Sequence, residues 1–251
     1  MKISIVLPIK NEEDCILAVL TEIVDTLEKE NVPYEMVCVN DNSTDGTLQI
    51  LQQLAGKNKN IQVVNRAQPS GFGRAVKDGL MHATGDCMAI VMGDGSDDPA
   101  DIVKYYSLLC AGYDCVFGSR FLRESKVRDY PKLKLFINRL ANNFIRCLFL
   151  MKFNDTTNAF KAYRREVIEA VSPIQALHFN ITAEIPLKAL VRGFNYGVIP
   201  VNWYGRTSGV SKLKITDMGK KYLFTVLYVW LEKLLVWDDL PKKMETSANG
   251  T

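Results

Sequence analysis

Residues 1–47 read MKISIVLPIKNEEDCILAVLTEIVDTLEKENVPYEMVCVNDNSTDGT, with a helical pattern between two apolar runs. These runs, residues 3–7 and 35–39, lack the polar alternation of a strand with one solvated face, so we expect strands buried on both sides of a parallel sheet. Residues 12–29 repeat apolar side chains at helical spacing. Strand, helix and strand in this order predict the first unit of an α/β fold.

The same alternation continues to about residue 120. Further strands are expected at residues 61–64, 88–92 and 115–117, and further helices at residues 44–54, 73–82 and 99–110. This order predicts a mostly parallel, doubly wound, Rossmann-like sheet flanked by helices. In such sheets the functional residues lie at the carboxyl ends of the strands.

The pattern changes after residue 120. Residues 123–134 are charged and contain Pro131, which is typical of a loop. Helices are expected at residues 133–153, 181–192 and 216–237, and a strand at residues 193–203. We therefore divide the chain into an α/β domain (1–215), a C-terminal amphipathic helical appendage (216–243) and a polar tail (244–251) that is expected to be disordered.

The last expected helix is very apolar but unsuited to crossing a membrane. Glu232 and Lys233 interrupt it, whereas a membrane span needs about 20 consecutive apolar residues. Trp230 and Trp237, with lysines flanking the segment, are typical of a helix that lies in the membrane interface. A helix in the core or at a dimer interface is the alternative.

The bulk composition excludes some classes of protein. With 31 basic and 28 acidic residues among 251, the formal charge of +3 is too balanced to indicate a nucleic-acid partner. The six cysteines lie scattered in apolar segments beside only two histidines, a pattern typical of reduced, buried thiols in a cytosolic protein. The apolar run 3–9 is too short for a secretory signal peptide.

Polar motifs rich in carboxylates follow the expected strands. They are PIKNE (8–12), NDNSTDGT (40–47), GDGSDDP (93–99) and GSR (118–120). Each alone is explained by turn or cap chemistry, and we expect Ser43 or Thr44, and Asp98, to be N-caps. Carboxylates gathered at one sheet edge repel one another, however. A divalent cation with a diphosphate, and a base and ribose that need hydrogen-bond acceptors, would explain them together.

The order of the motifs adds a resemblance to a known family. VLPIKNEE, VNDNSTDGT, GFGRAVKDGL, DGSDDP and GSRF, in this order, resemble glycosyltransferase family 2, whose members have the GT-A fold. Residues 155–163, DTTNAFKAY, and 206–213, RTSGVSKL, resemble stretches of its dolichol-phosphate mannose synthase-like subgroup of polyprenyl-phosphate glycosyltransferases. The resemblance extends from about residue 1 to residue 215.

The resemblance implies an inverting transferase that takes a sugar from a nucleotide-diphosphate-sugar donor with Mg²⁺ or Mn²⁺. The residues implied to bind the nucleotide sugar are Pro8, Asn11, Glu12, Asp41 and Asp94. Asp94 would also hold the metal on the diphosphate. Met92 replaces the first Asp of the family's D-x-D motif, so Asp97, or else Asp98, would supply the second carboxylate.

The acceptor implied by the subgroup is a polyprenyl phosphate. The residues that match its phosphate contacts are Arg120, Lys134, Asn138, Arg206 and Lys212, with Lys134 and Asn138 in place of Arg and Ser. With Asp94, the cations Arg120, Arg206 and Lys212 are the expected catalytic groups. The lipid acceptor and the apolar last helix together imply a peripheral protein on the cytoplasmic side of a membrane, with the formation of a homo-oligomer left open.

Three alternatives stay open. A family 2 transferase that acts on a glycan hydroxyl needs a general base, for which Glu184 is the candidate. A non-catalytic nucleotide-sugar-binding homologue is suggested by Met92 alone. An enzyme that synthesises nucleotide sugars is disfavoured, because such enzymes usually carry a Gly-rich phosphate loop near the N-terminus and VLPIKNEE does not resemble one.

Overall fold

Seven strands form the central sheet of the computed structural model, which describes residues 1–128, 130–204 and 215–241. In the order β3-β2-β1-β4-β7-β5-β8, these strands are Ile61–Asn65, Tyr34–Asn40, Ile3–Ile9, Cys87–Ile90, Lys161–Arg164, Cys115–Ser119 and Tyr196–Pro200. Of these strands, β7 alone runs antiparallel to its neighbours. The carboxyl ends of all the others therefore meet at one edge of the sheet, as the sequence predicted.

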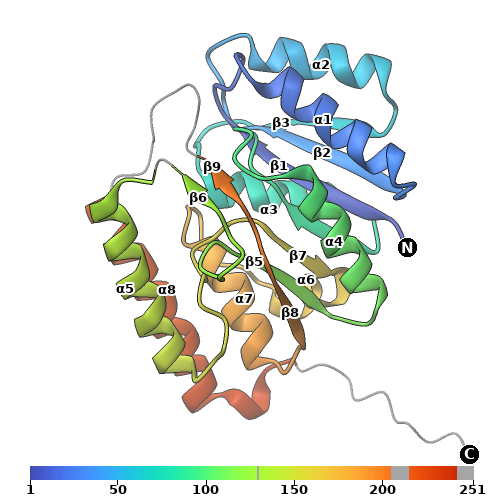
Figure 1. The fold of residues 1–251 in the computed structure, drawn as a ribbon. Coiled ribbons are helices and arrows are strands. Elements are labelled where there is room, and N and C mark those ends of the chain that lie inside the picture. The colour runs from blue at the N-terminus through green and yellow to red at the C-terminus, as the bar shows by residue number, and fades with distance from the viewer. Residues whose placement is uncertain (129, 205–214, 242–251) are drawn as a thin grey trace, which may run out of the picture.

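Helices cover both faces of the sheet (Figure 1). The first face carries α1 (Ile16–Lys29), α2 (Thr47–Lys57) and α4 (Pro99–Cys110), and the second carries α3 (Phe72–His82), α6 (Arg165–Val171) and α7 (Ile181–Val191). Along β1, Ile5 and Leu7 pack in the core of the first face and Val6 in that of the second, and all three are fully buried. This burial on both faces is the reason why the strand sequences lack polar alternation.

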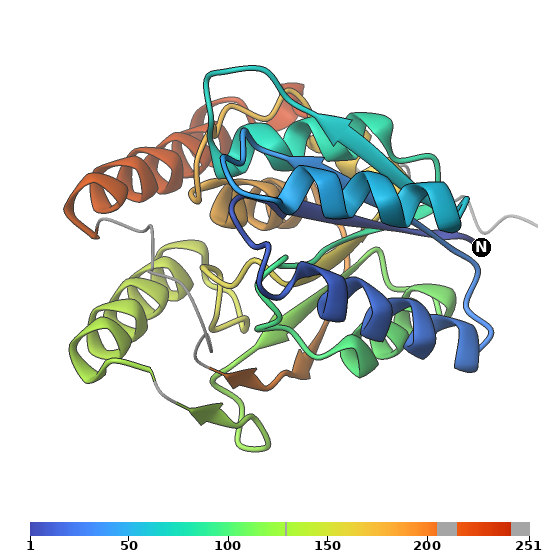
Figure 2. The ribbon, with the colours of Figure 1, turned by 90° about the horizontal axis from the view of Figure 1, so that it is seen from above.

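Two further helices, α5 (Lys132–Phe149) and α8 (Ile215–Leu235), project from the same side of the sheet (Figures 1 and 2). α8 packs on α7 and also contacts α5. Two short strands, β6 (Val127–Arg128) and β9 (Trp203–Tyr204), pair in parallel as a separate small sheet, and a short 3-10 helix (Trp237–Asp239) follows α8. In the described part of the chain, no helix has both the length and the apolar content to cross a membrane.

Some predicted helix starts are wrong. The first helix starts at Ile16 rather than at residue 12, and α2 starts at Thr47 with Gly46 at its N-cap, so neither Ser43 nor Thr44 caps it. Their hydroxyls instead bind the loop after β1, where they accept hydrogen bonds from the backbone N (3.0 Å) and Nδ2 (3.3 Å) of Asn11. Asp98 is confirmed as the N-cap of α4, since its side chain accepts from the Ala100 N–H at 2.9 Å.

The chain after residue 120 departs further from the prediction. Segment 123–134, predicted as a loop, contains β6 and the start of α5. α5 ends at Phe149 rather than at residue 153, because Leu150 adopts a left-handed conformation with φ of 55°. The predicted strand 193–203 is divided into β8 and β9, and β7 and α6 were not predicted. The predicted tail, residues 244–251, lies outside the described residues.

Candidate active site

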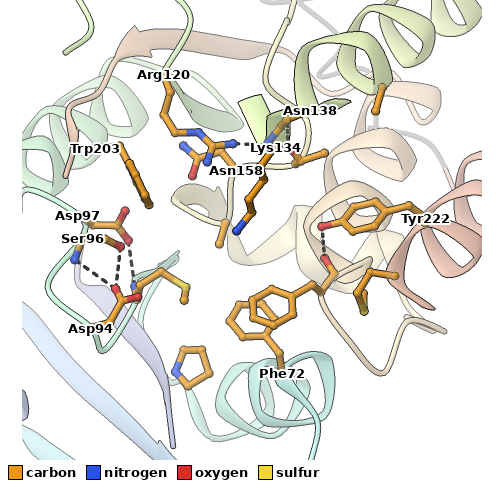
Figure 3. Close-up of a pocket in the computed structure, with 18 of the residues that line it drawn as sticks. Phe72, Asp94, Ser96, Asp97, Arg120, Lys134, Asn138, Asn158, Trp203 and Tyr222 are labelled. Atoms are coloured by element: carbon orange, nitrogen blue, oxygen red, sulfur yellow. Dashed lines mark hydrogen bonds between the residues drawn. The ribbon is translucent and has the colours of Figure 1, made fainter. Parts of the chain in front are cut away.

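A cavity of about 1010 Å³ lies at the carboxyl edge of the sheet and extends between α5 and α8 (Figure 3). Loops after β1, β2, β4 and β5 line one part of it, and the two projecting helices line the other. Eight residues selected from the sequence line this single cavity: Pro8, Glu12, Asp41, Asp94, Asp97, Arg120, Lys134 and Asn138. Arg206 and Lys212 lie outside the described residues.

Asp41 forms a rigid acceptor at one end of the cavity. One carboxylate oxygen is paired with the Arg66 guanidinium, and the other accepts the Gly71 N–H at 2.8 Å. Arg66 in turn pairs with Asp78 of α3, so the guanidinium is held from two sides. A carboxylate fixed in this way offers its remaining lone pairs in a defined direction to N–H or O–H groups of a ligand.

Asn11 does not line the cavity with the other residues predicted to bind the nucleotide. Its Oδ1 accepts the Thr44 N–H at 2.8 Å, so its side chain joins the loops after β1 and β2. Its φ of 50° lies in the left-handed region, which Asn tolerates better than most residues. The structure therefore gives Asn11 a role in shaping the two loops.

Two carboxylates, Asp94 and Asp97, line the cavity in the loop that follows β4. Asp94 Oδ1 accepts hydrogen bonds from Ser96 N (3.1 Å) and Ser96 Oγ (2.7 Å), while Asp97 Oδ2 accepts the Met92 N–H at 2.9 Å. Burial, with a further contribution from the negative charge of Asp94, raises the pKa of Asp97 to about 7. Asp98 points elsewhere, because it caps α4 and does not line the cavity.

This pair fits a hard divalent cation. Oxygen ligands of opposite charge are what Mg²⁺ and Mn²⁺ prefer, and a cation would relieve the repulsion that the pair shows. Among the described residues, no group of three or more His, Cys, Asp or Glu side chains is arranged to hold a metal. Asp94 and Asp97 would thus share the ion with oxygens of a bound ligand and with water.

Arg120 lines an adjoining part of the cavity and is anchored there by Asp155, which is fully buried. The guanidinium makes a bidentate contact, from Nε to Oδ2 at 2.8 Å and from Nη2 to Oδ1 at 2.7 Å. The Arg120 backbone N–H also donates to Oδ2 at 2.9 Å. The guanidinium therefore reaches the cavity with a fixed position and with part of its charge already balanced.

Lys134 and Asn138 enter the cavity from α5 (Figure 3), and both contact Tyr130. Asn138 Nδ2 donates to the Tyr130 hydroxyl at 2.9 Å, and Asn138 Oδ1 accepts from the Thr157 hydroxyl at 2.9 Å. The Lys134 ammonium lies 5.8 Å from the centre of the Tyr130 ring. Together with Arg120, these groups form a polar wall that carries two cationic side chains.

The part of the cavity between the projecting helices is apolar. Its walls include Ile137, Ala141 and Phe144 of α5, and Met218, Leu223 and Val226 of α8. At the junction with the polar part, the rings of Phe72 and Phe179 stack with centroids 4.2 Å apart and an angle of 9°. The Tyr222 hydroxyl donates to the Phe179 carbonyl at 2.7 Å, which fastens α8 to this junction.

Glu184 is not placed to act as a general base on a ligand in this cavity. Its side chain is fully buried, pairs with Lys188 at 2.8 Å and accepts the backbone N–H groups of Gln175 (2.7 Å) and Ala176 (2.6 Å). It is absent from the cavity lining. Its bonds are those of a structural anchor.

Several site residues were missed by the sequence reasoning. Tyr130 and Trp203 line the cavity, and Asp155 anchors Arg120 beneath it. The DTTNAFKAY stretch was recognised as a motif, which was a signal for Asp155, Thr157 and Asn158. Nothing in the sequence marked Trp203, because its place depends on the pairing of β9 with β6.

The family model of glycosyl transferase family 2 matches residues 4–172. The chain belongs to this family. Among curated relatives of this family 2 chain, the dolichol-phosphate mannosyltransferase of Pyrococcus furiosus is 29% identical over 242 residues, covering 95% of this chain and 65% of that protein. The polyprenol monophosphomannose synthase of Mycolicibacterium smegmatis is 27% identical over 204 residues, covering 74% and 77%. The family 2 chain thus spans less than two thirds of the Pyrococcus protein.

Solved structures confirm the predicted GT-A fold of the family 2 chain. Glucosyl-3-phosphoglycerate synthase from Mycobacterium tuberculosis, in complex with Mn²⁺, UDP and phosphoglyceric acid, has a TM-score of 0.70 and 19% identity, covering 91% of this chain and 78% of that one. The same protein with Mg²⁺ and UDP has a TM-score of 0.66 and 17% identity, covering 92% and 79%.

Proposed function

We propose that this family 2 protein transfers a sugar, with inversion, from a nucleoside-diphosphate sugar to a polyprenyl phosphate at a membrane surface. The observation that carries the proposal is the continuity of one cavity. Its polar part holds an acceptor for a nucleotide, a pair of carboxylates and two cations, and its other part is an apolar passage between α5 and α8. The nucleotide and diphosphate of the donor suit the polar part, and the hydrocarbon chain of the acceptor suits the apolar passage. The phosphate of the acceptor suits the two cations.

The donor is assigned to the loops after β1, β2 and β4. Asp41, with Pro8 and Glu12 beside it, binds the nucleoside, since a fixed carboxylate accepts N–H or O–H groups of the base or ribose. Asp94 and Asp97 hold Mg²⁺ or Mn²⁺, which would neutralise charge on the departing diphosphate. The ligands of the structural neighbours support this assignment, because those structures are complexes with UDP and Mn²⁺ or Mg²⁺.

The acceptor phosphate is assigned to the wall formed by Arg120, Lys134 and Asn138. Two cationic groups and an amide suit a phosphate, and Arg120 is held in place by Asp155. Arg206 and Lys212 follow Trp203 in the sequence and are assigned to the same phosphate on the family resemblance. The name of one curated relative contains dolichol phosphate and the name of the other contains polyprenol monophosphomannose, which fits this acceptor.

An anionic acceptor removes the need for a general base. A phosphate oxygen is already negatively charged near neutral pH, whereas a sugar hydroxyl must lose a proton as it attacks. Glu184 is buried in its pair with Lys188, which disfavours the hydroxyl-acceptor alternative. The work of the protein is to position two anions for in-line attack and to stabilise the charge on the departing diphosphate.

The exposed surfaces of α5 and α8 suit a peripheral position on the cytoplasmic leaflet. Large apolar side chains project into solvent from both helices, including Phe136 (66% exposed), Leu140 (62%), Phe224 (68%) and Leu234 (62%). Such a surface marks an interaction site, and cationic residues on and near both helices favour anionic lipid. A polyprenyl phosphate could then enter the passage between the helices directly from the bilayer.

A transfer assay tests the proposal. The purified protein is incubated with GDP-, UDP- or dTDP-sugars, Mn²⁺ or Mg²⁺, and liposomes that contain a short polyprenyl phosphate, and the lipid products are identified by mass. We expect a metal-dependent glycosyl-phospholipid from at least one donor. Transfer only to 3-phosphoglycerate or to a simple sugar would support the hydroxyl-acceptor alternative. Donor binding with no turnover would support a non-catalytic homologue.

A further inference from the structure

We propose that Trp203 is the residue that stacks on the donor sugar and thereby contributes to sugar recognition. This inference rests on the proposed function, because it assumes a nucleoside-diphosphate sugar in the cavity. Figure 3 shows Trp203 on the same side of the cavity as Ser96 and Asp97, with its ring directed into the open space. Arg120 lies on the adjoining wall.

The order of the strands places this ring away from the nucleoside. Asp41 follows β2, Asp94 and Asp97 follow β4, and Trp203 follows β8 at the far edge of the sheet. A donor whose base lies at Asp41 and whose diphosphate lies at Asp94 therefore extends its sugar toward β5 and β8. Trp203 stands at that end, so its ring meets the sugar and not the base.

The backbone around Trp203 is fixed by the small sheet. Val127 of β6 is its partner in the parallel register, and the Trp203 N–H donates to the Lys126 carbonyl at 2.9 Å. The Lys126 N–H is bound in turn by Asn202 Oδ1 at 3.1 Å. These bonds hold the backbone of β9 at Trp203 in a fixed position relative to β6.

The indole ring of Trp203 also contacts a second aromatic ring of the cavity lining. The Tyr130 ring packs on it with centroids 4.9 Å apart at an angle of 54°. Tyr130 in turn contacts Lys134, whose ammonium lies 5.8 Å from its ring centre, and accepts the hydrogen bond of Asn138. Through Tyr130 the indole is thus connected to the wall that we assign to the acceptor phosphate, and this contact restricts its orientation before a donor binds.

The chemistry of the indole suits a pyranose ring. An aromatic face is apolar and carries partial negative charge, so it attracts the C–H side of a sugar. The hydroxyl groups at the edge of that sugar then meet the polar neighbours of Trp203, such as Asp97 and Arg120. Apolar stacking beside directed polar contacts is how a small-ligand site fixes both position and orientation.

Calorimetry with matched ligands tests this assignment. We compare GDP with GDP-mannose and UDP with UDP-glucose, each with Mn²⁺, on wild-type protein, Trp203→Ala and Trp203→Phe. For the pair that the wild type binds, Trp203→Ala should weaken the sugar nucleotide about two- to tenfold and leave the diphosphate unchanged. Trp203→Phe should retain most of the affinity. Trp230→Phe, in a partly buried position outside the cavity, is the matched control.

Each outcome decides the matter. Unchanged diphosphate affinity in Trp203→Ala also shows that the variant is folded, so loss of the sugar contribution alone supports stacking on the sugar. Equal losses for the diphosphate and for the sugar nucleotide would place the ring on the nucleotide and overturn the inference, as would no loss for either ligand. A wild-type protein that binds none of these four ligands, and neither dTDP nor dTDP-glucose, would overturn the proposed function, and the inference with it.

Discussion

Asp94, Asp97 and Asp98 are close in sequence but differ in what they contact. Asp94 and Asp97 line the cavity, whereas Asp98 caps α4. Asp94→Asn should reduce metal-dependent turnover by about a hundredfold or more, because a catalytic metal supplies several kcal/mol of charge stabilisation. Asp98→Asn is a matched control, since Asn caps a helix as well as Asp does. Turnover and Mn²⁺-dependent binding of nucleoside diphosphate, measured for both variants, check the assignment, and equal effects of the two changes would contradict it.

Lys161 has a structural task beneath the site. Its ammonium is buried and donates to the carbonyls of Thr156 (3.0 Å), Asn158 and Thr182 (3.2 Å), which ties the turn that follows Asp155 to α7. Burial lowers the pKa of Lys161 to about 7. The ordinary pKa of a lysine is near 10.5. Between about pH 7 and pH 10.5, Lys161 is therefore protonated in the unfolded chain but has lost this proton in the folded chain.

This difference predicts how the stability depends on pH. Where the unfolded state binds more protons, the free energy of unfolding rises with pH, so Lys161 should make the protein more stable at pH 9 than at pH 7. Lys161→Met should lower the stability and reduce this increase. Lys152→Met, at an exposed position, should keep the wild-type pH dependence. Urea unfolding at pH 7, 8 and 9 measures the three slopes, and an unchanged slope in Lys161→Met would contradict the prediction.

At the scale of the elements, the surroundings of α8 explain why its sequence is largely apolar but contains charged residues. Val226 and Val229 are buried, and the helix packs on α7. Glu232 also lies on an inner side, where it accepts the Tyr228 hydroxyl at 2.8 Å and faces Arg192 at 3.9 Å. Of the two charges that interrupt the apolar pattern, that of Glu232 thus interacts within the protein. Large apolar side chains remain exposed on the helix, at Leu223, Phe224, Leu227, Leu231 and Leu234.

A substitution among these exposed side chains tests membrane binding. Phe224→Glu should weaken binding to liposomes, because the side chain is 68% exposed and a carboxylate would have to enter the interface. Leu17→Glu, on α1 at 54% exposure, makes the same kind of change away from the two projecting helices and should have no effect (Figure 1). Co-sedimentation with anionic vesicles measures both. If Phe224→Glu instead dissociates a soluble dimer and liposome binding is unchanged, α8 is an oligomer interface.

A comparison of the strands and site residues shows which of them could be predicted from the sequence alone. Strands β1, β2 and β3 were predictable because apolar runs bounded by turn residues have few other interpretations. β7 was missed, since its four residues, KAYR, begin and end with a charge and its burial depends on pairing with β4 and β5. Asp41 and Asp94 were found through motifs at strand ends. Tyr130 and Trp203 were not, because two segments far apart in sequence bring them together.

At the scale of the whole molecule, the cavity divides the proposed task between two parts of the chain. The sheet edge supplies the groups for the donor, and the projecting helices supply the passage for the lipid. The two parts meet at the wall of Arg120 and Lys134 and at the Phe72–Phe179 pair. A change within the passage should therefore affect the acceptor alone.

Filling the passage separates these two tasks. Ala141 lines the passage from α5. The indole of Ala141→Trp would fill space that the first isoprene units of the lipid need, and would thereby displace the lipid. We expect turnover with polyprenyl phosphate to fall about tenfold or more, because a tenfold loss corresponds to only about 1.4 kcal/mol. Donor binding and slow donor hydrolysis should stay unchanged. Asn143→Trp, exposed on the same helix and outside the cavity, should leave all three unaffected. Equal acceptor kinetics in Ala141→Trp and wild type would show that the lipid takes another path.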